Sequence, residues 1–288
     1  CGFIWKAGFY YLDRYDGYEV KSYLIGDKNK NFVGDRIINL FEDKIHDLWV
    51  ISDKGFLRYN RISDSFYLIP YEYSSEPYCV DENNTIWLAK NGLCVLNREE
   101  GKVKRIVTLQ DSVSTITPMG NELWLSVKDK IVRFDKTTLE RSYFQPITKS
   151  TLNSYKNILK DPNGLLWILD DKRLFLYNPG NFQYWEWKFD ELPGNEIPCR
   201  LTVDMSGNLW LASESGCYMF PFSKDRIIRF KHDPNDPNSI QSDLITGIFV
   251  DNHNILWLTT LQNGIASIDL SQKPFGKISR IPYGSNTL

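Results

Sequence analysis

Few residues of this 288-residue chain have the types and spacing of a catalytic or metal centre. Its three histidines, His46, His232 and His253, show no zinc-ligand spacing, and no Cys-x-x-Cys occurs. The Gly-x-Ser-x-Gly motif, the phosphate-binding loop and the Gly-x-Gly-x-x-Gly motif are also missing from the sequence. We therefore expect no catalytic residues, no metal and no cofactor.

Two acidic features are better explained by solvated loops than by chemistry. The pairs Asp170-Asp171 and Glu99-Glu100 fall in turn-like segments, where exposed side chains are a simpler interpretation than an acid–base pair. Residues 232–238 are rich in oxygen ligands but lack the spacing of a helix-loop-helix calcium site. Two prolines in this stretch favour a stiff extended connector.

The elements that must position any site come from a repeat of about 40 residues, a length typical of propeller blades. An aliphatic residue followed by tryptophan recurs at Trp5, Trp49, Trp87, Trp124, Trp167, Trp210 and Trp257. Six residues before five of these stands an aspartate: Asp43, Asp81, Asp161, Asp204 and Asp251. Pro118 holds that place in the fourth repeat. The pattern predicts an all-β, seven-bladed β-propeller of four-stranded antiparallel blades, forming one domain over residues 1–288.

Both recurrent residues have a structural interpretation. The aspartate carboxylate can accept backbone N–H bonds and close the first hairpin of its blade. The tryptophan ring can fill the space between adjacent blades. The first blade lacks its innermost strand, and residues 282–288 resemble the segments that precede an innermost strand elsewhere. We therefore expect a fragment of a longer protein, and leave open whether a strand outside this sequence closes the ring.

The charge composition of the chain excludes one class of binding partner. A net charge of −2 without a basic cluster predicts no binding of nucleic acid.

Cys79 with Cys94, and Cys199 with Cys217, fall on strands separated by a middle one, too far apart for a disulfide. Free, packed thiols are expected. Cys1 leads straight into a strand, which disfavours lipid modification, although whether it is a natural mature N-terminus stays open.

Several phrases resemble two-component regulator propeller repeats, namely residues 230–240 (FKHDPNDPNSI), 245–251 (ITGIFVD) and 255–260 (ILWLTT). The resemblance implies the periplasmic sensor region of an inner-membrane hybrid histidine kinase, non-catalytic in itself, that senses glycan-derived ligands. It also implies further propeller and β-sandwich segments in the same chain and a homodimeric receptor. Family repeats often carry Trp-Ile-Gly-Thr, whereas this chain has lost the glycine, as in Trp257-Leu258-Thr259-Thr260.

Ligands of propellers usually bind at one mouth of the central channel, where second-to-third-strand turns converge. The candidate ligand-binding residues at these turns are Lys54, Lys90, Asn91, Lys128, Asp171, Arg173, Glu214, Gln262 and Asn263. Mixed charges and amides suit an oligosaccharide, and equally suit an ordinary wet surface. The aromatic run at 184–187 favours packing against the next blade over a sugar platform.

Two other functions remain open. A lyase or glycosidase acting on acidic sugars would need a base beside a cation, for which His232 next to Arg173 is the candidate pair. The second open function is a protein-interaction scaffold that binds no small ligand. Ligand identity and oligomeric state do not follow from the sequence.

Overall fold

The structure is a computed structural model that describes residues 3–72, 77–89, 92–109, 111–128, 130–144, 157–170, 173–188, 200–223, 226–236, 239–260 and 264–271. Across these residues the chain is built from β-strands, with one 3-10 turn, η1 (Lys28–Lys30). None of the helical structure in the described ranges has the length and hydrophobicity needed to cross a membrane.

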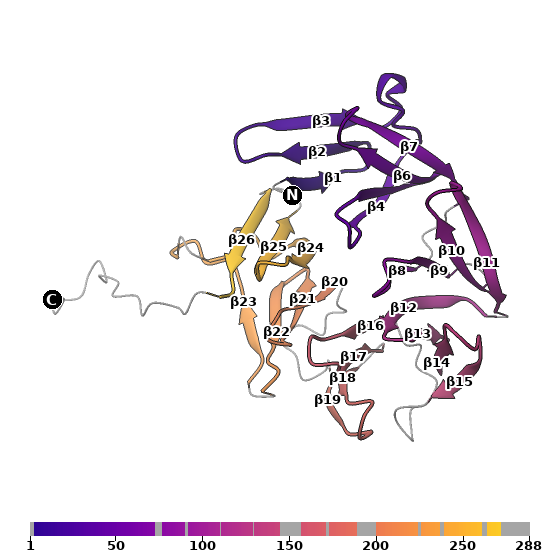
Figure 1. Ribbon diagram of the computed structural model, residues 1–288. Helices are drawn as coiled ribbons and strands as arrows, with labels where there is room; N and C mark the ends of the chain where they lie inside the picture. Colours follow the sequence, from indigo (N-terminus) through magenta and orange to yellow (C-terminus); the bar gives the residue numbers. More distant parts are fainter. Residues whose placement is uncertain are drawn as a thin grey trace, which may run out of the picture. The chain divides into compact units, whose positions relative to one another are not determined.

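The described strands form seven antiparallel sheets that follow one another in chain order, which are the seven blades of a β-propeller (Figure 1). Within each sheet every strand pairs with the next in sequence, because short turns join them. This confirms the predicted fold class. Five sheets have four strands, and the first and last have three among the described residues.

The chain divides into two compact units, and each is described separately. The first unit, residues 1–160 and 166–186, holds five sheets, except that residues 187–188 at the end of the fifth belong to the second unit. Their strands are β1 (Ile4–Ala7), β2 (Tyr11–Tyr15), β3 (Val20–Leu24); β4 (Ile37–Glu42), β5 (Leu48–Ser52), β6 (Gly55–Asn60), β7 (Ser65–Pro70); β8 (Tyr78–Val80), β9 (Ile86–Ala89), β10 (Gly92–Asn97), β11 (Lys102–Thr108); β12 (Val113–Met119), β13 (Glu122–Val127), β14 (Lys130–Asp135), β15 (Arg141–Phe144); and β16 (Asn157–Lys160), β17 (Leu166–Leu169), β18 (Arg173–Tyr177), β19 (Tyr184–Lys188).

The second unit, residues 161–165 and 187–288, holds the last two sheets. Their strands are β20 (Arg200–Val203), β21 (Leu209–Ser213), β22 (Gly216–Phe220), β23 (Ile228–Phe230); and β24 (Ile245–Val250), β25 (Ile255–Thr260), β26 (Ile265–Asp269). The assignment of residues 1–288 to a single domain remains a prediction.

The first blade begins with its tryptophan strand, as expected. Trp5 lies in β1, which pairs with β2, and β2 pairs in turn with the outer strand β3. In the later blades the tryptophan lies in the second strand, for example Trp49 in β5 between β4 and β6. The described part of the first blade therefore contains the second, third and fourth strands of the repeat.

Neighbouring sheets within each unit pack face to face. Leu12 and Tyr23 of the first sheet join Leu48, Leu57 and Phe66 of the second in one buried cluster. In the second unit, Trp210 and Cys217 of β20–β23 meet Leu256 and Leu258 of the last sheet. Strands such as β5, β9 and β17 are buried along their whole length, since both faces of the sheet are covered.

Five of the seven recurrent tryptophans are buried core residues of these interfaces, and Trp5 and Trp257 are partly buried. Trp49 is completely buried and Trp167 is 1% exposed, and Trp124, Trp210 and Trp87 are also buried. Trp49 joins the cluster between the second and third sheets, where it meets Leu88 and Cys94. The predicted packing role of these rings is confirmed.

The described cysteines are free thiols in the core. Cys79, Cys94 and Cys217 are buried and form no disulfide. Cys79 and Cys94 belong to different hydrophobic clusters, although both lie in the sheet β8–β11. Burial raises the pKa of the Cys217 thiol to about 12. Cys1 and Cys199 lie outside the described residues.

Replacing Trp49 with alanine should lower the free energy of unfolding by about 3–5 kcal/mol, because it empties a fully enclosed site between two sheets. Denaturant titration followed by circular dichroism measures this change. Tyr18→Ala is the control: Tyr18 is 97% exposed, and its loss should change stability by less than about 0.5 kcal/mol. Equal effects of the two substitutions would contradict the packing role.

Candidate functional site

The recurrent aspartate is the most regular polar group of the blades. Asp43 Oδ1 accepts the backbone N–H groups of Ile45 and Asp47, while its Oδ2 accepts the Trp49 indole N–H at 2.8 Å. The same indole bond is 2.9 Å long from Trp87 to Asp81, from Trp210 to Asp204 and from Trp257 to Asp251. The predicted closure of the first hairpin is confirmed. The bond to the ring was not predicted, although the constant six-residue spacing was its signal.

The fourth blade keeps the indole bond with a different acceptor. Pro118 occupies the aspartate position, and Trp124 Nε1 donates instead to Glu122 Oε2 at 3.0 Å. Arg133 on the neighbouring strand β14 binds both carboxylate oxygens of Glu122. The tryptophan indole N–H therefore keeps a carboxylate acceptor in the blade that has no aspartate at the repeat position.

Two of the buried aspartates receive a cation from the following blade. Arg98 NH1 lies 3.0 Å from Asp43 Oδ2, and Lys136 Nζ lies 2.9 Å from Asp81 Oδ2. Burial alone would raise the pKa of Asp81, but the hydrogen bonds from Trp87 and Lys136 outweigh it and lower the pKa. These carboxylates are fully engaged in holding the fold, which supports their structural interpretation.

Lys54, a predicted ligand residue, belongs to a charged network at the turn between β5 and β6. Its Nζ lies 3.2 Å from Asp53 Oδ2 and 3.3 Å from Asp35 Oδ2. Asp53 Oδ1 also accepts the backbone N–H groups of Asp35 and Arg36, at 2.8 and 3.2 Å. The turn is thereby tied to the connection from the first blade, and Lys54 stays half exposed.

A glycine determines how this turn enters the third strand. Gly55 has φ +137°, and a Cβ added there would meet the carbonyl of Ile69 on the outer strand. Gly92 and Gly216 hold the same place in two other blades, with positive φ and the same kind of close approach. Each of these third strands is therefore entered through a backbone conformation that only glycine suits.

Two other predicted ligand residues, Lys128 and Arg173, are each held by a different carboxylate. Lys128 Nζ lies 2.5 Å from Asp111 Oδ1. Arg173 binds the buried Asp170 through Nε and NH2, at 3.1 and 2.8 Å.

Glu214 is exposed in the turn between β21 and β22. Five of the predicted ligand residues lie outside the described residues: Lys90, Asn91, Asp171, Gln262 and Asn263. The assignment of the nine residues to a ligand site therefore stays a prediction.

The remaining polar and aromatic candidates have local partners. His232 Nδ1 lies 2.8 Å from the carbonyl oxygen of Ile240, in its own connector. Trp187 packs edge-on against Phe220, with ring centroids 6.0 Å apart, as the packing interpretation of the aromatic run requires. Among the residues with described positions, no group of three or more His, Cys, Asp or Glu side chains is placed to hold a metal ion.

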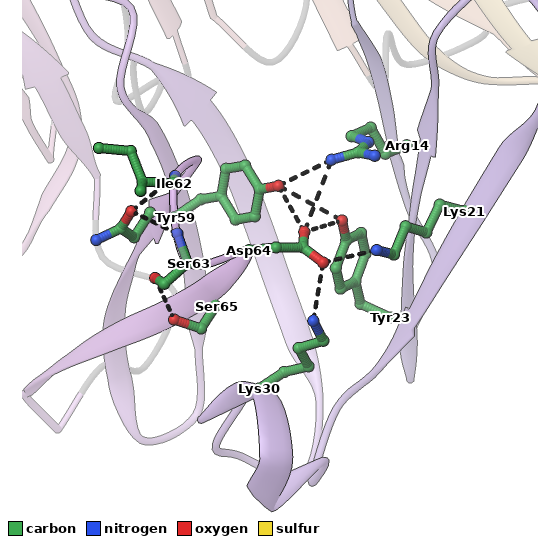
Figure 2. Close-up of polar contacts among 10 residues, drawn as sticks. Arg14, Lys21, Tyr23, Lys30, Tyr59, Ile62, Ser63, Asp64 and Ser65 are labelled. Carbon is green, nitrogen blue, oxygen red and sulfur yellow. Dashed lines mark hydrogen bonds and ion pairs between the residues drawn. The ribbon is translucent and has the colours of Figure 1, made fainter.

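One polar cluster was not predicted from the sequence, and Figure 2 shows it around Asp64. Asp64 Oδ1 accepts the hydroxyls of Tyr23 and Tyr59, at 2.6 and 2.7 Å. Its Oδ2 lies 2.6 Å from Lys21 Nζ and 2.8 Å from Lys30 Nζ. Burial would raise the pKa of Asp64, but these partners lower it well below the usual range.

A third cation completes this cluster. Arg14 donates to the Tyr59 hydroxyl at 2.9 Å, and its NH1 lies 3.7 Å from Asp64 Oδ1. The cluster, hereafter the Asp64 cluster, therefore combines β2, β3 and η1 of the first blade and its connector with β6 and the following turn of the second. No sequence motif signals it, because its members come together only in the folded chain.

The charged turn at Lys54 gives a pH prediction. Backbone hydrogen bonds and Lys54 together overcome desolvation and lower the pKa of Asp53 to about 2. Because the folded-state pKa lies below the ordinary 3.8, this carboxylate stabilises the fold fully above that pH, and its contribution is lost as the pH falls toward 2.

Titration of the Asp53 carboxyl carbon by NMR measures this pKa directly. Lys54→Met should raise the pKa only in part, since the two backbone N–H donors remain. Lys160→Met, far along the chain, is the control and should leave the value unchanged. An ordinary pKa for Asp53 in the unaltered protein would disprove the hydrogen-bonded arrangement.

The solved structures similar to this chain include two kinds of propeller, sensor domains and a lyase. No family model and no curated protein sequence matches the chain. Among solved structures, it is similar to the extracellular domain of BT4673, described as a hybrid two-component system of B. thetaiotaomicron, with a TM-score of 0.71 and 21% identity. That match covers 92% of this chain and 36% of the other. The extracellular domain of BT3049 from the same organism matches with a TM-score of 0.68 and 18% identity, and the match covers 92% of this chain and 38% of the other.

The second kind is an enzyme. Virginiamycin B lyase from Staphylococcus aureus matches with a TM-score of 0.68 and 15% identity, covering 91% of this chain and 89% of the lyase. The chain thus spans about a third of the sensor structures but nearly the whole lyase. At these identities the likeness establishes the architecture alone, so the protein is a seven-bladed β-propeller of the kind found in extracellular sensor domains of two-component systems and in a lyase.

Proposed function

We propose that this chain is a non-catalytic sensor module of a hybrid two-component system and that it recognises glycan-derived ligands outside the cytoplasm. The observation that carries the proposal is the match of 92% of the chain to part of the extracellular domain of BT4673, at a TM-score of 0.71. The recurrent phrases at 230–240 and 245–260 support the same assignment from the sequence.

A periplasmic sensor region of an inner-membrane histidine kinase is the setting that this proposal implies. The matched sensor structures are about two and a half times as long as this chain, because the match takes 92% of this chain and covers 36% of BT4673. Further propeller and β-sandwich segments of the same chain, and a second copy in a homodimer, are the partners that we propose. Ligand binding would then shift the population between two arrangements of the receptor and so alter kinase output.

The turns between second and third strands support the proposed ligand class. Lys54 is half exposed and Glu214 is exposed there, and both can form charge-assisted hydrogen bonds to sugar hydroxyls. Lys128 is 65% exposed at the corresponding turn of the fourth blade. Polar groups of both signs spread over several turns suit an oligosaccharide, which offers both donors and acceptors.

A lyase is the second candidate function, favoured by the nearly complete coverage of virginiamycin B lyase. It requires a base next to a cation. His232 is the histidine proposed for that role, and its Nδ1 is engaged with the Ile240 carbonyl, leaving Nε2 as the nitrogen that could take a proton. Acidic sugars would be the substrates.

Calorimetric titration with a panel of neutral and acidic oligosaccharides tests both functions. We expect saturable binding of one class, with the sugar recovered unchanged by mass spectrometry. Lys54→Gln and Lys128→Gln, both within the first unit, should each weaken that binding about tenfold, the loss expected for one charge-assisted hydrogen bond. Lys104→Gln, on the exposed outer strand β11, is the matched control.

The outcomes separate the functions. Conversion of the sugar to a product, lost in a His232→Ala variant, would replace the sensor proposal by the lyase. If none of the oligosaccharides in the panel binds, glycan sensing by this chain is contradicted and a protein-interaction scaffold is favoured.

A further inference from the structure

The Asp64 cluster holds more positive charge than its carboxylate can neutralise (Figure 2). Three cations, Arg14, Lys21 and Lys30, face the single carboxylate of Asp64. In the part of the chain that the structure describes, none of the three forms an ion pair with a second carboxylate. Two positive charges are therefore left over.

Asp64 itself has no capacity for further donors. Its Oδ1 accepts two tyrosine hydroxyls and its Oδ2 accepts two ammonium groups, which occupies the four lone-pair positions of a carboxylate. The lysines are in the opposite situation. An ammonium has three N–H donors, and Lys21 and Lys30 each give one to Asp64.

The spare donors face solvent, whereas the base of the cluster is fixed. Lys21 is 44% exposed and Lys30 31%, while Tyr23 and Tyr59 are 2% and 3% exposed. Both ammonium groups bind the same oxygen atom, so they are held close together in spite of their like charge. This arrangement is pre-organised, because ordinary surface lysines would first have to lose side-chain freedom.

We propose that the Asp64 cluster is a binding site for a doubly charged oxyanion, a sulfate or phosphate group, bridged between Lys21 and Lys30 at the junction of the first and second blades. The charge of such a group matches the two uncompensated cations. Its oxygens accept the spare N–H donors, and Arg14 adds a third positive charge beside them. This inference does not depend on the proposed sensor function.

Calorimetric titration with sodium sulfate at constant ionic strength, balanced with sodium chloride, is the direct test. We expect saturable binding that the double variant Lys21→Gln/Lys30→Gln weakens at least tenfold. Lys160→Gln is the matched control, since Lys160 is similarly exposed, at 37%, and its described ion pair is with Glu82. Binding of sulfate that does not saturate, or equal affinity in the double variant, would overturn the proposal.

A parallel titration with glucose 6-phosphate, a phosphate ester with nearly two negative charges at neutral pH, and with glucose as its control, identifies the source of the anion. Tighter binding of the ester than of inorganic phosphate would assign the site to a phosphorylated saccharide. Equal affinities would assign it to the oxyanion alone. Binding of glucose itself, independent of Lys21 and Lys30, would contradict recognition through the anionic group.

Discussion

The hydrogen bond from a tryptophan indole to a buried aspartate is the interaction on which the blades depend. At Asp43 one oxygen closes the first hairpin through two backbone N–H groups, while the other orients the ring of Trp49. A buried carboxylate is tolerated only when its acceptor positions are filled, so the turn and the ring stabilise each other. The fourth blade shows the same constraint, because Glu122 supplies the acceptor that Pro118 cannot.

This interaction also separates two ends of each blade. In an antiparallel sheet the aspartate turn lies at one end and the turn between second and third strands at the other. The first end is occupied by structural bonds, with Arg98 and Lys136 reaching back to the preceding blade. The second end is where Lys54 and Lys128 are exposed. Substitutions at the second end therefore leave the hydrogen bonds of the first hairpins intact.

Charge balance distinguishes the Asp64 cluster from the recurrent anchors. Asp43 is fully buried and faces the single cation of Arg98 across its indole-bonded oxygen. Asp64 is 23% exposed and faces three cations. A buried ion pair whose charges cancel holds blades together, whereas an accessible cluster with surplus positive charge attracts an external anion. The same chemical groups therefore have different consequences in the two places.

The spacing of Trp and Asp along the chain was enough to predict the all-β class, seven blades, the three-stranded first blade and the buried rings, because a repeat must bury the same face at the same position each time. Turn residues such as Lys54 and Glu214 could be located for the same reason. The sequence could not show that Lys54 is bound by Asp53 and Asp35, or Arg173 by Asp170, since these contacts depend on side-chain directions at the turns. Tertiary structure alone decided the Asp64 cluster, which joins residues as far apart as Arg14 and Asp64 through packing of two sheets that no local pattern records.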